Sequence, residues 1–329
     1  MNLEHLSRKT RLRVVSLSIG AGILILGLKY AAYLISGSTA LLSDAIESVV
    51  NVVAAVFALG AVIFAEKPAD REHPYGHGKI EHFSAAFEGG LITLAAAFIL
   101  IEAAEALVRG VQLRNLGRGL ALNLLAGGFN GLLGWFLVHK GRVTRSKALE
   151  ADGHHILSDF WTTVGIAIGL LTVKLTGLTW MDPIMAMLVG LLLGRTGFRL
   201  VAASSKALLD SEDPQVLGQV LDAMNHARPW DIIALHELRT FRTGRYTHVD
   251  VHLVVPEYYS IRQAHDLCEG FGLDALQSAG IEGEVHTHVD PCRQLYCRRC
   301  AAPDCPLRMA PGTATEPFQL AEATATGPA

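Results

Sequence analysis

Four polar side chains fall inside apolar stretches of the chain, with a spacing typical of a metal site. Glu47 and Asn51 lie four residues apart, and so do His155 and Asp159. Residues four apart lie on one face of a helix, so each pair can direct two side chains to one point. A charge at the centre of a bilayer costs at least ~2.5–3.5 kcal/mol on insertion scales, so it indicates a pathway or a partner. Two such helices could place four ligands around one ion; hydrogen bonds between neighbouring helices are the alternative.

Two further carboxylates lie in the same apolar stretches. Asp44 precedes Glu47 by three residues and is interpreted as a helper of the pair, outside the ligand set. Glu88 lies in the next apolar stretch, where a packing role or a place on a proton path is expected.

A second candidate site follows the Glu47 stretch, in the segment EKPADREHPYGHGKIEHF. Asp70, His73 and His77 are spaced three and four residues apart, beside Gly76 and Gly78, which allow a tight turn. Imidazole and carboxylate ligands suit zinc, cobalt, iron or manganese. Simple exposed loop histidines are the alternative.

Near the end of the chain, four cysteines fall in fourteen residues as C-x4-C-x2-C-x4-C. Their C-x2-C centre has the spacing of zinc ligands, and four thiolates fit a closed structural site. An iron–sulfur cluster and free thiols remain open alternatives. The four are Cys292, Cys297, Cys300 and Cys305; the fifth cysteine, Cys268, is expected as a small buried residue of a helix.

The elements that would position these residues divide the chain in two. Of the 329 residues, 50% are hydrophobic and only 18% are charged, below the roughly 25% of soluble domains. The net charge of −3 gives no argument for a nucleic-acid partner. Six apolar stretches are long enough to cross a bilayer. They are residues 12–35, 39–65, 83–108, 119–139, 153–176 and 181–204.

Lys and Arg predict the orientation of these spans. They gather before the first span, in the loops 66–82 and 140–147, and at the end of the sixth span. This distribution predicts that both termini lie in the cytoplasm. The loop between the third and fourth spans also carries arginines, although it is predicted to lie on the outer side. The predicted parts are a cytoplasmic segment 1–11, a six-helix domain 12–208, a cytoplasmic domain 209–291, a cysteine-rich tail 292–309 and a disordered tail 310–329.

After Asp210 the pattern changes to soluble α+β. Helices are expected at 213–227 and 260–279, and strands at 231–242, 245–255 and 283–290. Alternation places His248, Asp250 and His252 on one face of the middle strand, and His286, His288 and Asp290 on one face of the last strand. Solvated strand faces are the alternative to a metal site.

Three motifs, in this order, resemble the cation diffusion facilitator family of divalent metal cation/proton antiporters. They are S-D-A-x-E-S-x-x-N, H-P-Y-G-H-G-K and A-D-x-x-H-x-x-x-D, and the resemblance covers about residues 8–291. It implies that Glu47, Asn51, His155 and Asp159 form a tetrahedral transport site. The commonest family pattern has two Asp, or His and Asp, on the second helix, so the Glu and Asn found here weaken pure zinc selectivity. His155 argues against an all-oxygen manganese site.

The same resemblance implies a ferredoxin-like cytoplasmic domain with α-β-β-α-β order, used for dimerisation and metal sensing. It also implies a charge contact between Lys79 and Asp210. The cysteine cluster is not required by the family pattern. The implied metal-binding positions of the cytoplasmic domain are His236, His252, His265, His288 and Asp290.

The expected function is therefore efflux of a divalent metal in exchange for protons, by a homodimer in the cell (inner) membrane. Zinc is the first candidate as substrate and structural ion, followed by iron, cobalt, cadmium and manganese. A metal-sensing membrane protein and a membrane metalloenzyme are the alternatives. An enzyme is not expected, because the sequence has no H-E-x-x-H motif.

Overall fold

The computed structural model describes residues 3–111, 113–144, 147–244, 246–303, 305–310, 312 and 316–327. Side chains at 3–18, 62, 141–144 and 147–152 are outside this description. The chain forms two compact units: Met1–Ile63 with Phe83–Ser204, and Phe64–His82 with Ser205–Ala329.

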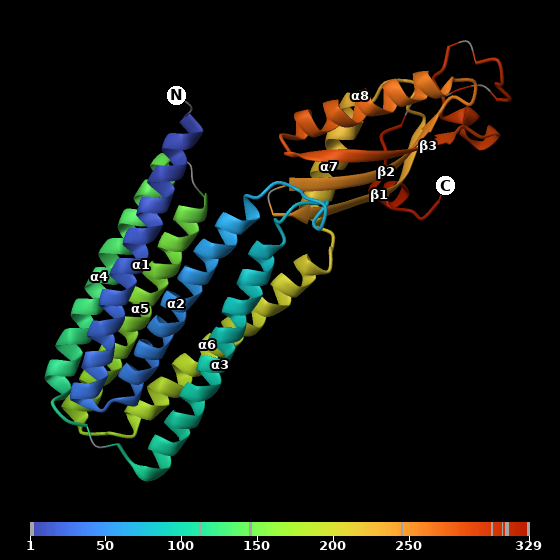
Figure 1. The fold of residues 1–329 in the computed structure, drawn as a ribbon. Helices are drawn as coiled ribbons and strands as arrows, with labels where there is room; N and C mark the ends of the chain where they lie inside the picture. Colours follow the sequence, from blue (N-terminus) through green and yellow to red (C-terminus); the bar gives the residue numbers. More distant parts are fainter. Residues whose placement is uncertain are drawn as a thin grey trace. The chain divides into compact units, whose positions relative to one another are not determined.

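The first unit is a bundle of six long helices (Figure 1), which confirms the six predicted spans. Each has a window of at least 18 residues with the hydropathy of a membrane span. The helices are α1 (Leu3–Ser36), α2 (Thr39–Ala65), α3 (Ile80–Arg109), α4 (Leu116–Thr144), α5 (Lys147–Thr176) and α6 (Met181–Leu208).

Small residues bring α4 close to α5, the helix that carries His155 and Asp159. A Cβ at Gly127 would press on the Thr163 side chain, and a Cβ at Gly134 would meet Leu157 and the backbone of Gly153. Close backbone approach through small residues is a main source of helix association in membranes. The glycines of α4 therefore fix where α5 presents its polar face.

A buried carboxylate fixes the start of α2. Asp182, at the start of α6, accepts hydrogen bonds from the Ser38 hydroxyl and from the backbone N–H and hydroxyl of Thr39. Because the first backbone N–H groups of a helix have no partner within it, a carboxylate there satisfies them and complements the helix dipole. This contact holds α2 against α6.

The second unit contains a three-stranded sheet with helices on one face (Figure 1), which confirms the predicted α-β-β-α-β order. In the sheet order β1-β2-β3, β1 and β2 pair antiparallel, and β2 and β3 pair parallel. The elements are α7 (Pro214–Ala227), β1 (Ala234–Thr243), β2 (Tyr246–Val255), α8 (Ile261–Ala279) and β3 (Gly283–Pro291).

The central strand β2 divides its residues between the two faces of the sheet. Val249, Val251 and Leu253 are at most 1% exposed and belong to the core shared with α7 and α8. Successive strand residues point to opposite faces, so the even-numbered residues of β2 lie on the face away from these helices. That face carries His248 and His252.

The end of the chain differs from the disordered tail expected after Ala310. Phe318 and Ala323 are buried in the core, and Ala323 is the last residue of the short helix α9 (Leu320–Ala323). The Asn225 side chain forms two hydrogen bonds with the backbone of Phe318, and the backbone N–H of Glu237 donates to the carbonyl of Ala325. Residues 316–327 are mostly small or polar, a composition that indicated disorder. Their single aromatic residue, Phe318, nevertheless packs into the core of the domain.

Candidate metal sites

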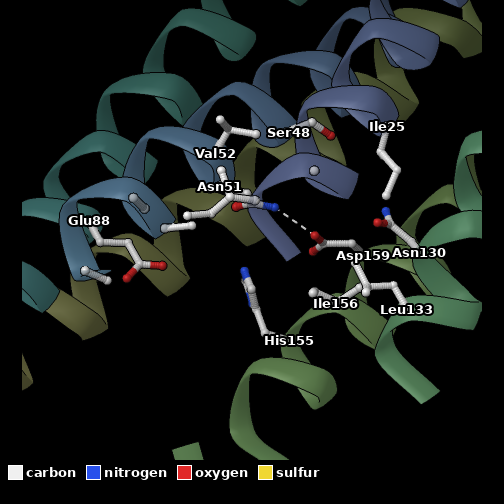
Figure 2. Close-up of a pocket in the computed structure, with 15 residues that line it drawn as sticks. Ile25, Ser48, Asn51, Val52, Glu88, Asn130, Leu133, His155, Ile156 and Asp159 are labelled. Atoms are coloured by element: carbon white, nitrogen blue, oxygen red, sulfur yellow. Dashed lines mark hydrogen bonds between the residues drawn. The ribbon is translucent and has the colours of Figure 1, made fainter. Parts of the chain in front are cut away.

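The four residues of the predicted transport site line one cavity of about 210 Å³ in the helical unit. Asn51 Nδ2, from α2, donates a hydrogen bond to Asp159 Oδ2, from α5, at 2.7 Å. Figure 2 shows this bond and a neighbouring cavity of about 160 Å³, into which His155 points from α5. Glu47 lines the first cavity only.

The carboxylates of α2 differ in how they are neutralised. Asp44 lies 2.7 Å from the ammonium of Lys29 on α1, with both side chains fully buried, and it also accepts a hydrogen bond from Thr163. Glu47 is 9% exposed, and its Oε2 has no hydrogen-bond partner among the described residues. A buried carboxylate oxygen without a partner is costly, so Glu47 fits a cation ligand better than Asp44 does.

Lys29 was missed in the sequence, although an isolated lysine within an apolar stretch is a signal for a buried acidic partner. Glu88, from α3, lines the same cavity as Asn51 and His155, where Figure 2 shows its carboxylate. It contributes a polar wall to that cavity.

The loop between α2 and α3 brings Asp70, His73 and His77 together, with their ligand atoms within 4.8 Å of one another. One Asp70 oxygen lies 3.3 Å from His73 Nδ1, and the other lies 3.4 Å from His77 Nε2. Hydrogen bonds from the backbone of His73 and Glu72, and from the His73 side chain, lower the pKa of Asp70 against the smaller opposing effect of desolvation. The carboxylate is therefore ionised at neutral pH and able to bind a cation.

On the open face of the sheet, His236, His252 and Asp290 form a second group with ligand atoms within 4.8 Å. Asp290 Oδ2 lies 3.2 Å from His236 Nε2 and 3.1 Å from His252 Nδ1. Beyond this contact of Nε2 with Asp290, the ring nitrogens of the buried His236 have no hydrogen-bond partner among the described residues. Desolvation by burial lowers the pKa of His236, which favours the neutral imidazole that a metal requires.

The other two implied ligands lie outside this group. His288 lies on β3, the strand that also carries Asp290, and is 65% exposed, with Nε2 3.7 Å from Asp290 Oδ1. His265 lies on α8, exposed, with Nε2 3.4 Å from Glu269. Of the five implied ligands, the structure therefore groups His236, His252 and Asp290. His288 lies beside this group, and His265 lies apart from it.

Sequence reasoning missed a third group, formed by His248, Glu284 and His286. One oxygen of Glu284 lies 2.8 Å from His248 Nδ1 and 3.2 Å from His286 Nε2. His248 is 2% exposed, and its other nitrogen lies 2.9 Å from the Thr243 hydroxyl. The alternation of the two strands contained this signal, but only their register brings the three residues together.

Two remaining predictions concern the second unit. Lys79 Nζ donates a hydrogen bond to Asp210 Oδ2 at 2.8 Å, with both side chains about two-fifths exposed (39% and 43%). The four cysteines after β3 are unpaired, and all four line one cavity of about 300 Å³.

Comparison with known proteins agrees with this geometry. Residues 15–209, more than half of the chain, match the cation efflux transmembrane domain, and residues 225–292 match the cytoplasmic domain of cation efflux proteins. An uncharacterized transporter of Synechocystis sp. is 37% identical, over 84% of this chain and 88% of its own. Cation-efflux pump FieF of Serratia proteamaculans is 30% identical (83% and 89%), and that of Shewanella oneidensis is 28% identical (83% and 92%).

Six membrane-spanning helices, polar pairs inside α2 and α5, and a small α+β domain are thus found in a sequence that matches both domains of one transporter family. The chain belongs to the cation diffusion facilitator family of multi-pass cation efflux transporters.

Proposed function

We propose that this transporter exports a divalent transition metal from the cytoplasm in exchange for protons. The observation that carries the proposal is the cavity shared by Glu47, Asn51, His155 and Asp159 inside the helical unit. These side chains offer carboxylate, amide and imidazole donors, which suit zinc and its neighbours. A site between the helices of the bundle is what alternating access to the two sides of a membrane requires.

The balance of charge inside the helices supports the coupling to protons. Lys29 neutralises Asp44, so Glu47 and Asp159 are the two carboxylates of the cavity wall that remain for a substrate. Two carboxylates balance one divalent cation, and on the return step two protons balance them equally well. Because a carboxylate or imidazole must lose its proton to bind metal, the same groups carry both substrates.

Asn51 has two chemical roles in this arrangement. Its Nδ2 holds Asp159, and its Oδ1 is a neutral oxygen donor on the other branch of the amide. An amide in place of the more common carboxylate lowers the negative charge of the site. The imidazole and carboxylate ligands make zinc the first candidate substrate, and the amide, which weakens pure zinc selectivity, leaves iron, cobalt, cadmium and manganese as competitors.

The second unit supports a regulatory role within the same proposal. In each of the groups Asp70–His73–His77 and His236–His252–Asp290 the ligand atoms lie within 4.8 Å of one another, as a metal-binding sensor requires. His288 lies beside the second group and extends it in the proposed site, whereas His265 lies apart from it on α8. The match to the cytoplasmic domain of the family supports a homodimer formed through this unit, with both termini in the cytoplasm and the helices in the cell (inner) membrane.

Metal flux into sealed vesicles tests the proposal. The purified protein, reconstituted with a metal-sensitive dye inside, is supplied with zinc, iron, cobalt, manganese or cadmium, with and without a pH gradient. We expect metal entry that accelerates when the lumen is acidic and a matching release of luminal protons. Metal binding without flux would instead favour a membrane metal sensor, and flux indifferent to the pH gradient would contradict proton exchange.

A further inference from the structure

The four cysteines after β3 form a group of their own, separate from the histidine clusters. Cys292 extends the strand pairing, because its backbone N–H donates to the carbonyl of Val255. Cys297 lies in the short 3-10 helix η1 (Gln294–Arg298), and Cys300 follows it, 7% exposed. Cys305 completes the wall of the cavity of about 300 Å³ that all four line.

Polar groups around this cavity can accommodate sulfur ligands bound to a metal. The backbone N–H of Glu257 donates to Cys292 Sγ at 3.4 Å, a contact that stabilises negative charge on sulfur. Arg293 and Arg308 line the same cavity. Zinc bound by four thiolates carries two net negative charges, which two arginines in the wall can balance.

We propose that Cys292, Cys297, Cys300 and Cys305 bind a structural zinc ion that fastens the chain after β3 to the cytoplasmic domain. Four cysteines with a central C-x2-C are the usual ligand set of a closed tetrahedral zinc site. The site is distinct from the transport cavity, which lies in the helical unit, and its ligands are sulfur only.

Metal must draw these sulfurs inward. Among the described residues, the groups of three or more ligands within 4.8 Å of one another are all built from histidines and carboxylates, so the thiols are spaced more widely. In the described part of the segment that carries them, there is one short 3-10 helix and no strand pairing beyond Cys292. It can therefore tighten around an ion without breaking the sheet.

The segment also forms a wall of the neighbouring histidine site. Arg293 and Tyr296 line a cavity together with His236, His252 and Asp290. Thr326 and Gly327 from the end of the chain line it too, and an ion pair between Arg299 and Glu322 joins the two segments. A zinc ion at the cysteines would hold this wall in place, so that the histidine site can exchange its metal without losing its shape.

Metal analysis of the full-length protein in detergent tests the proposal. After dialysis against EDTA, which removes accessible metal, we expect the wild type to retain about one zinc per chain, held by four thiolates. A thiol-specific mercurial should release that zinc. The double variant Cys297→Ser/Cys300→Ser should retain none.

Cys268→Ala is the matched control. Cys268 is 1% exposed in α8, and desolvation by burial raises its pKa to about 11, so it remains an unreactive thiol outside the cluster. This variant should keep its zinc. If Cys268→Ala also loses its zinc, the loss in the double variant reflects unfolding, and the assignment of a zinc site to the four cysteines would be wrong.

Cobalt substitution of the wild type gives a second measurement that does not depend on variants. Cobalt bound by four thiolates shows intense sulfur-to-metal charge-transfer absorption together with the visible bands of tetrahedral cobalt. Absence of the charge-transfer bands, retained iron with acid-labile sulfide, or disulfides between these cysteines would each overturn the proposal. Zinc retention is measured without transport, so a failed flux assay would leave this result intact.

Discussion

The transport cavity and the histidine group on the sheet contain similar side chains, held in different ways. Asp159 lies on one helix and accepts a hydrogen bond from Asn51 on another, whereas Asp290 lies on a strand paired along its length with β2. The ligand atoms of His236, His252 and Asp290 lie within 4.8 Å of one another. Among the described residues, Glu47, His155 and Asp159 form no group that compact.

This difference matches what the proposed function requires of each region. A transported ion must leave its site on every cycle, so ligands assembled by helix packing release it more easily. A sensor site must bind metal at its cytoplasmic concentration, so a prearranged group is an advantage. The comparison predicts that changes in the cavity affect flux, whereas changes on the sheet affect metal-dependent stability.

The largest effect is expected at Asp159. Asp159→Asn removes one of the two carboxylates that balance the substrate, so flux in vesicles should fall to the background of empty liposomes. The protein should still purify as a folded dimer. Thr172→Val is a suitable control, because Thr172 is partly exposed on the same helix and its hydroxyl donates to the backbone carbonyl of Ile168 in that helix. Wild-type flux in Asp159→Asn would remove this residue from the site.

A large effect on stability is expected at Asp290. A ligand that binds only the folded state stabilises it by about 2.7 kcal/mol at a hundredfold excess over Kd. Thermal unfolding of the cytoplasmic domain in the full-length protein should show this gain with zinc, and Asp290→Asn should lose most of it. His288→Ala should lose less, because His288 is 65% exposed and lies beside the compact group.

His226→Ala provides the control for this series. His226 is exposed on α7, and its Nδ1 lies 2.7 Å from the carbonyl of Asp222 in the same helix. The zinc-dependent gain should be unchanged. A wild-type unfolding temperature indifferent to zinc would contradict the sensor role.

Substitution of Asn51 should change selectivity more than rate. Asn51→Asp replaces an amide-to-carboxylate hydrogen bond by two facing carboxylates, which repel unless a cation or proton lies between them. We therefore expect flux with a steeper pH dependence and an altered order of preference among zinc, iron and manganese. The order of preference is measured from flux assays in which two metals compete. An unchanged order of preference would exclude Asn51 as a ligand.

Exchange of the charges at Lys79 and Asp210 tests a smaller effect. Both side chains are partly exposed, so the contact is worth at most ~1 kcal/mol. Lys79→Glu or Asp210→Lys alone should lower transport activity, and the double variant should recover it. If the double variant is no better than the worse single variant, the two residues act independently.

The smallest effect is a pH dependence at Glu284. Hydrogen bonds from His248 and His286 lower the pKa of Glu284 below its ordinary value of 4.5, overcoming the opposing effect of desolvation, which is the largest single influence. The stabilisation by this carboxylate is therefore complete above about pH 4.5 and is lost as the pH falls through the lower folded value.

Glu284→Gln should flatten the acid limb of the stability curve, measured with EDTA present. The difference in stability between the wild type and the variant should be full above about pH 4.5 and should disappear as the pH falls through the folded pKa of Glu284. A wild-type acid limb retained in the variant would show that the carboxylate contributes nothing measurable there.

Much of the fold was predictable because its signals are local. Apolar stretches of spanning length predict the six helices, and a two-residue alternation predicts β2 and β3. The pairing of Asp44 with Lys29 was not predictable, because it depends on how α1 packs against α2. The group of His248, Glu284 and His286 depends on a register across the whole of α8.

Gly78, next to His77 in the loop between α2 and α3, is another residue whose role depends on a contact distant in the sequence. A Cβ at Gly78 would collide with the backbone carbonyl of Thr243, at the turn between β1 and β2. The sequence suggested that this glycine allows a tight turn. The structure adds that it permits a close contact with a hairpin more than 160 positions further along the chain.

The register of β2 has a consequence for how this domain can change over time. His236, His252 and His288 occupy one row across the three strands, because each is paired with the next. Replacement of one member alters a single ligand. Insertion or deletion of one residue in β2 would rotate every later side chain to the opposite face, sending His252 into the core and a valine or leucine to the surface. In proteins that evolve from this one, insertions and deletions within β2 should therefore be far rarer than substitutions.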